Sequence, residues 1–146
     1  ILITSQEASQ SGFLYKLYIF NGHTVKEIYS DYPFPGVHSI GDDIYITIDR
    51  KIHKIVKGEL VLWKEFPGSI FMNGFIGRNE KDFFVYGDGD DGVSHLMHYN
   101  GTELQTLFTT EFWFYDYQIF EKDVFVLAED PVTEKKIVIR GTLKDK

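Results

Sequence analysis

The chain has 146 residues, a net charge of −7 and no cysteine. The acidic charge argues against a non-specific nucleic-acid binder, which needs a basic surface, and the lack of thiols excludes disulfides, thiolate metal sites and a cysteine nucleophile. The chain contains only two alanines, whereas 16% of its residues are aromatic, and this composition is typical of β-structure. No apolar stretch approaches the length of a membrane span.

Apolar runs bounded by turn residues predict short strands, and these strands fall into four consecutive groups. The first group covers residues 1–31, with strands expected at 1–5, 13–20 and 24–29. Residues 36–66 and 69–110 follow, with strands expected at 36–40, 43–48, 52–56 and 59–64, and at 69–76, 82–87, 94–99 and 102–108. Residues 112–146 close the chain, with strands expected at 112–120, 123–128 and 135–140 and a remnant at 142–144.

Two markers recur along these groups. An aspartate followed by apolar residues begins the second strand of a group at Asp43, Asp82 and Asp123. A glycine follows the third strand at Gly22, Gly58, Gly101 and Gly141. Glycine at such a place predicts a hairpin turn with positive φ, and an aspartate repeated in every unit predicts a turn cap and not a catalytic group. The groups are therefore copies of one unit of roughly forty residues.

A unit of four antiparallel strands repeated in this way predicts an all-β fold of the β-propeller type, in which each unit is a blade. The chain holds about three and a half blades, whereas a closed propeller has about four to eight. We therefore expect one partial propeller domain, the C-terminal part of a larger one, whose remaining blades come from further sequence or from another chain. Ile1 already lies in a predicted strand, which favours a start upstream, and the polar residues 144–146 favour a natural C-terminus. A small propeller or an open stack of sheets is the alternative.

One unit also resembles a known repeat. The stretch 75–87, with its Asp-aromatic strand, and the turn His98-Tyr99-Asn100-Gly101 resemble a propeller repeat of Bacteroidetes-type bacteria. The resemblance is close for this unit and loose for its neighbours. It implies a propeller and an exported protein, secreted or lipid-anchored, in an extracellular, periplasmic or cell-surface location. The repeat is structural and implies no catalytic residue.

Asp88, Asp90 and Asp91 are the candidate metal ligands, because carboxylates interleaved with glycines can wrap Ca²⁺, which takes about six to eight oxygen ligands. Aspartate and glycine are also ordinary turn residues. The twelfth position of the loop, where a calcium loop carries a glutamate, is Tyr99. An acidic hairpin turn without a cofactor is therefore the favoured interpretation.

Five aromatic residues are the candidate binding residues. The run 112–117 is denser in aromatic residues than a core requires, and strand alternation places Trp113, Tyr115 and Tyr117 on one face. Packing between blades is the first interpretation of that face, and a surface for sugar or protein is the second. Tyr32 and Phe34 lie in the loop that joins the first two groups, and such loops often carry function.

Two classes of function fit these features. The first is a non-catalytic binding or scaffold module that recognises a protein or glycan partner, and not nucleic acid, through the blade loops. The second is a carbohydrate-active enzyme similar to a glycoside hydrolase, with two or more carboxylates at the propeller channel. We favour the first, because the sequence holds no catalytic cluster outside the repeats.

Overall fold

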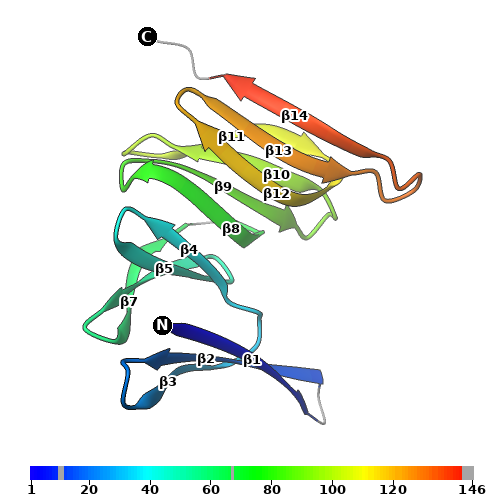
Figure 1. Ribbon diagram of the computed structural model, residues 1–146. Coiled ribbons are helices and arrows are strands. Elements are labelled where there is room, and N and C mark those ends of the chain that lie inside the picture. The colour runs from blue at the N-terminus through cyan, green and yellow to red at the C-terminus, as the bar shows by residue number, and fades with distance from the viewer. Residues whose placement is uncertain (10–11, 67, 143–146) are drawn as a thin grey trace.

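The computed structural model describes residues 1–9, 12–66 and 68–142, and these residues form four antiparallel sheets in chain order (Figure 1). The first sheet contains β1 (Leu2–Ser9), β2 (Gly12–Phe20) and β3 (Val25–Asp31). The second contains β4 (Gly36–Ile40), β5 (Asp43–Ile48), β6 (Lys51–Val56) and β7 (Glu59–Glu65). The third contains β8 (Ile70–Asn79), β9 (Asp82–Gly89), β10 (Ser94–Tyr99) and β11 (Leu104–Thr110). The fourth contains β12 (Trp113–Phe120), β13 (Asp123–Glu129) and β14 (Lys136–Thr142).

The predicted all-β class is confirmed, and the described sheets do not close into a ring (Figure 1). Within each sheet, strands that follow one another in sequence are hydrogen-bonded neighbours. The second, third and fourth sheets meet through their first strands, because β8 contacts both β4 and β12. The first sheet contacts the second through β3 and β7. No helix long and apolar enough to cross a membrane occurs in the described part of the chain.

The end of the fourth sheet differs from the prediction. Gly22, Gly58 and Gly101 have positive φ at hairpin turns, as expected. Gly141 does not, because β14 continues through it and pairs it with Val124. The predicted turn at Arg140-Gly141 is therefore wrong. The polar residues 144–146 lie outside the described residues, as does the expected remnant strand apart from its first residue, Thr142, which belongs to β14.

The third sheet supplies the centre of the core. β9 is buried on both faces, so that Phe83, Phe84 and Val85 follow one another as a continuous apolar run. Phe83 and Val85 pack against the second sheet, and Phe84 packs against the fourth. A strand covered on both faces does not alternate apolar and polar residues. In β13, nearer the end of the row, fully buried residues alternate with half-buried ones. Each buried phenylalanine contributes about 1.5–3 kcal/mol of transfer free energy.

The repeated aspartates join strands and do not cap the turns as predicted. Asp43 accepts a hydrogen bond from Lys54 at 2.7 Å, and Asp123 accepts one from Arg140 at 2.7 Å. In the third sheet His98 Nε2 lies 2.8 Å from Asp82, which also accepts a hydrogen bond from Arg78 Nε on β8 at 2.6 Å. In each of these three sheets the third strand supplies one partner, which is Lys54, His98 or Arg140. This partner is paired in the sheet with the residue two places after the aspartate. The aspartates therefore tie the second strand to the third at the end opposite the hairpin that joins these two strands.

A hydrogen-bonded group, which we call the hub, links three sheets. Tyr117 of β12 places its hydroxyl 3.1 Å from the carbonyl oxygen of Phe75 on β8 and 3.2 Å from Nδ1 of His38 on β4. His38 Nε2 lies 3.2 Å from the hydroxyl of Thr47 on β5. A carbonyl only accepts, so Tyr117 donates to Phe75, His38 Nδ1–H donates to Tyr117 and the Thr47 hydroxyl donates to Nε2. The sheets approach closely here, since a Cβ on Gly74 would lie 2.7 Å from both His38 and Tyr117.

The hub predicts a pH-dependent stability. Burial lowers the pKa of His38 to about 4, so the folded protein binds fewer protons than the unfolded chain below the ordinary histidine pKa. The free energy of unfolding should therefore fall by up to about 3 kcal/mol between pH 6.5 and pH 4. Urea unfolding at a series of pH values measures this fall, and His38→Gln should reduce it. The half-buried His53, whose pKa is also lowered, and carboxylates with a lowered pKa such as Asp82 account for the slope that remains.

The matched control is His23→Gln, which changes an exposed histidine and should keep the slope of the original protein. An equal slope in the His38 and His23 variants would contradict the assignment to the hub.

Candidate binding cleft

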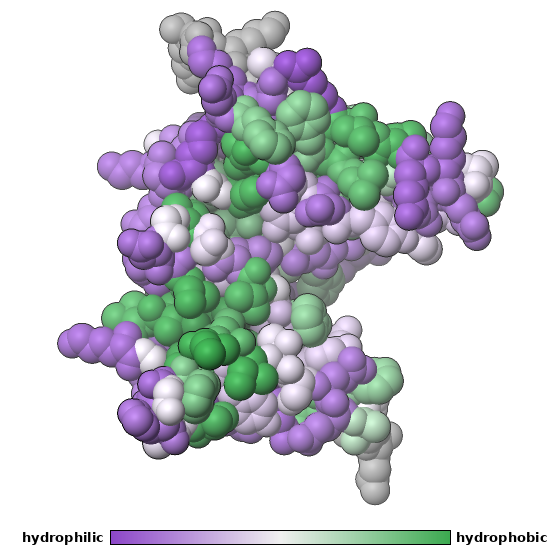
Figure 2. Space-filling model, in the orientation of Figure 1, coloured by the Kyte–Doolittle hydropathy of each residue, from purple (hydrophilic) through white to green (hydrophobic). Residues whose placement is uncertain are grey.

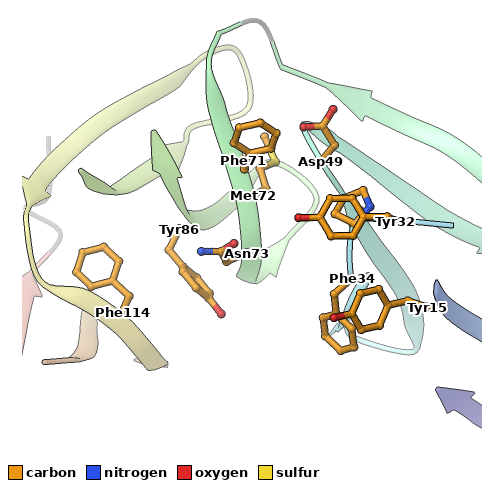
Figure 3. A pocket seen from close by; sticks show the side chains of 10 residues that line it. Tyr15, Tyr32, Phe34, Asp49, Phe71, Met72, Asn73, Tyr86 and Phe114 are labelled. Carbon is orange, nitrogen blue, oxygen red and sulfur yellow. The ribbon is translucent and has the colours of Figure 1, made fainter. Parts of the chain in front are cut away.

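An open cleft of about 820 Å³ lies at the end of the sheets where β5 and its counterparts β9 and β13 finish. Its lining comes from the first three sheets, from the connection between β3 and β4 and from β12 (Figure 3). The side chains that line it are Tyr15, Tyr32, Pro33, Phe34, Asp49, Phe71, Met72, Asn73, Tyr86 and Phe114. Six of these ten are aromatic.

One wall is formed by Tyr15 of β2 with Tyr32 and Phe34 of the connection (Figure 3). The ring of Tyr15 meets that of Phe34 edge-on at 5.1 Å and lies 6.4 Å from that of Tyr32. The connection is held at its start, where the Tyr29 hydroxyl donates to the Pro33 carbonyl at 2.7 Å. Tyr32 and Phe34 nevertheless remain 72% and 59% exposed, so this wall offers aromatic surface to a ligand.

The opposite wall is formed by Tyr86 of β9 and Phe114 of β12, and Phe71 and Met72 of β8 lie between the walls (Figure 3). Tyr86 packs edge-on against Phe114 at 6.5 Å and lies 4.4 Å from the ring of Tyr117. The second wall therefore rests directly on the hub.

Asp49 is the charged residue of the lining. It lies in the turn between β5 and β6 with φ of 57°, a left-handed conformation that aspartate adopts more readily than most residues. Its carbonyl oxygen accepts a hydrogen bond from Met72 N at 2.9 Å, which joins this turn to the start of β8. Its Oδ1 is buried without a hydrogen-bond partner among the described residues, and its Oδ2 lies 3.7 Å from Arg50 Nε.

Asn73 is the other polar side chain with a fixed orientation. Its Nδ2 donates to Asp88 Oδ2 at 2.6 Å, and the other oxygen of Asp88 accepts from the Ser94 hydroxyl at 2.6 Å. One N–H of its amide is engaged with Asp88, so Asn73 offers a ligand its carbonyl oxygen, an acceptor, and its second N–H.

The five predicted aromatic residues separate into three places. Tyr32 and Phe34 line the cleft, and Tyr117 is part of the hub. Trp113 and Tyr115 lie outside the lining, with 53% and 52% of their surface exposed. The predicted alternation is interrupted by a β-bulge between Phe114 and Asp116, which turns Tyr117 inward, away from the face of Trp113 and Tyr115.

The acidic hairpin is built from turn contacts. Asp88 uses both carboxylate oxygens within the third sheet, and Asp91 Oδ1 accepts from the backbone of Val93 at 3.0 Å. Across residues 1–9, 12–66 and 68–142, no three His, Asp or Glu side chains gather as a metal site would require.

Sequence reasoning missed Asp49, Asn73, Tyr15, Phe71, Tyr86 and Phe114 as cleft residues. They belong to β2, the β5–β6 turn, β8, β9 and β12, and only the stacking of the sheets brings them together. One signal was present in the sequence. An acid stands at the far end of the second strand in three units, as Asp49, Asp88 and Glu129.

Comparison with protein-family models finds no match for this chain, and a search of curated proteins finds none either.

The contacts of Asp88 generate a prediction on calcium. Since both of its oxygens already accept hydrogen bonds, 5 mM CaCl₂ should leave the Tm in differential scanning fluorimetry unchanged. Asp88→Ala should lower the free energy of unfolding by about 1–3 kcal/mol, because Ser94 is left buried without its acceptor. Asp90→Ala, on the exposed tip, is the control. A saturable rise in Tm with calcium, abolished by Asp90→Ala, would instead support the calcium site at this hairpin.

Proposed function

We propose that this chain is a non-catalytic recognition module that binds a protein segment or a glycan in the aromatic cleft. The observation that carries the proposal is the lining itself, with six aromatic side chains on two facing walls and a floor, and two polar side chains between them (Figure 3). Ligand sites are concave and mostly apolar, with a few placed polar groups that fix orientation. Aromatic rings supply large contact area at small entropic cost.

The lining favours binding over hydrolysis. A glycoside hydrolase needs two carboxyl groups on either side of the scissile bond. Among the residues that line this cleft, Asp49 is the single carboxylate. The carbohydrate-active enzyme is therefore the weaker alternative for this cleft.

We also propose that the four sheets are blades of a β-propeller. The support is the repeated unit, the shared order of strands and the contact of β8 with β4 and β12. The sheets at the two ends of the row leave large apolar side chains exposed, including Phe13 and Val138 (Figure 2). Further blades, from other sequence or another chain, would cover these side chains.

The proposal predicts that the first wall is needed for binding. The double variant Tyr32→Ala/Phe34→Ala should weaken the affinity of a bound ligand by at least about tenfold, because truncated aromatic anchors cost about 2 kcal/mol or more. The probes are hexasaccharides of β-1,4-linked glucose and xylose and a set of defined pentapeptides. Titration followed by ¹H–¹⁵N spectra measures affinity and locates the site.

The matched control is Trp113→Ala, which removes an exposed aromatic ring outside the cleft and should bind as the original chain does. The proposal fails if a probe binds while the resonances of the cleft residues stay unchanged, or if the double variant binds with full affinity and an unchanged Tm.

A further inference from the structure

We infer that the ligand of the cleft presents a guanidinium group, as an arginine side chain of a partner protein does. This inference rests on the proposed function and names the chemistry that the site would recognise. It follows from three features. No lysine or arginine of the described residues lies over a ring of the cleft, the acids at this end of the sheets are incompletely neutralised, and the lining contains hydrogen-bond acceptors.

The first feature is the distribution of the chain's own cations. Elsewhere, lysine and arginine side chains lie over aromatic rings, as Lys64 does over Tyr99 at 4.4 Å and Arg78 over Phe84 at 5.9 Å. A second cleft, of about 700 Å³ between β7 and β11, contains Lys64 over its rings in this way. None of the six rings of the aromatic cleft carries a cation from the described residues. Their faces are therefore open to a cation from outside.

The second feature is an asymmetry of charge between the two ends of the second strands. At one end the repeated aspartates contact bases at 2.7–2.8 Å. At the cleft end the acids are Asp49, Asp88 and Glu129. Asp49 and Glu129 lie 3.7 and 3.8 Å from Arg50 and Lys136, and Asp88 contacts the neutral Asn73 and Ser94. The cleft end is thus the less neutralised one and favours a cationic ligand.

The third feature is the hydrogen-bonding character of the lining. Asp49 offers its Oδ2 and Asn73 its carbonyl oxygen, so each side chain presents an acceptor. Arg50, the nearest base, donates to the carbonyl of Gly68 at 2.8 Å, and its Nε is beyond hydrogen-bond distance of Asp49. A guanidinium fits this set because it only donates, forks toward two acceptors and stacks flat on aromatic rings. A lysine ammonium lacks the flat face.

The experiment compares two peptides, acetyl-Gly-Gly-Arg-Gly-Gly-amide and the same peptide with citrulline, a neutral residue of nearly equal shape. Titration of the chain followed by ¹H–¹⁵N spectra should show the arginine peptide binding at least about tenfold more tightly. Asp49→Asn should remove most of that difference, and asparagine also tolerates the left-handed backbone at this position. The affinity for arginine should fall as NaCl rises from 50 to 500 mM.

Trp113→Ala is the control, and it should leave both affinities unchanged. Equal affinity for the two peptides, or an arginine preference that survives Asp49→Asn, overturns the inference. Equal binding of the two peptides, or binding of a hexasaccharide and neither peptide, would reject the guanidinium. Either result would retain the recognition module if Tyr32→Ala/Phe34→Ala abolished that binding. Loss of the arginine preference in both Asp49→Asn and the double Tyr32/Phe34 variant, with unchanged Tm, supports both proposals.

Discussion

The hydroxyl of Tyr117 is the point at which three sheets of the chain meet. It bonds the backbone of β8 and the imidazole of His38 on β4 while its own strand, β12, belongs to the fourth sheet. Backbone and side chain can approach this closely only because residue 74 has no Cβ. An unmade bond here would leave buried donors and acceptors without partners, at about 1–3 kcal/mol for each group. This one hydroxyl group therefore helps to fix the relative placement of β4, β8 and β12, together with the apolar packing between their sheets.

A single bulged residue determines the orientation of a side chain in the hub and of a side chain in one wall of the cleft. Between Phe114 and Asp116 the chain of β12 holds an extra residue, Tyr115, relative to its partner β13. The bulge resets the alternation, so Phe114 and Tyr117 both point toward the third sheet, where they contact Tyr86. With regular alternation they would point to opposite faces, and either the wall or the hub would be lost.

Local chemistry explains what could be predicted from the sequence. The all-β class, the sheet membership of most strands and the turns at Gly22, Gly58 and Gly101 depend on neighbours in sequence, and they were predicted. The turn at Gly141 was not correct, because glycine is also tolerated inside a strand when its partner side chain, here Val124, needs the room. The bulge in β12 and the set of residues that line the cleft depend on how the sheets pack. The spacing of residues along the chain does not determine that packing.

Repeated and non-repeated residues have different roles in this molecule. Asp43, Asp82 and Asp123 recur, and each forms an ion pair with a cation on an adjacent strand, which is Lys54, Arg78 or Arg140. The acids at this end of the three sheets are therefore neutralised. Tyr32 and Phe34 occur once, in the connection between the first two sheets. The acids at the cleft end also recur, but only Asp49 lines the cleft, because the non-repeated connection brings the aromatic wall to that one sheet. A repeat can thus supply an acid at three of the four sheets, while a single connection determines which of those acids faces a ligand.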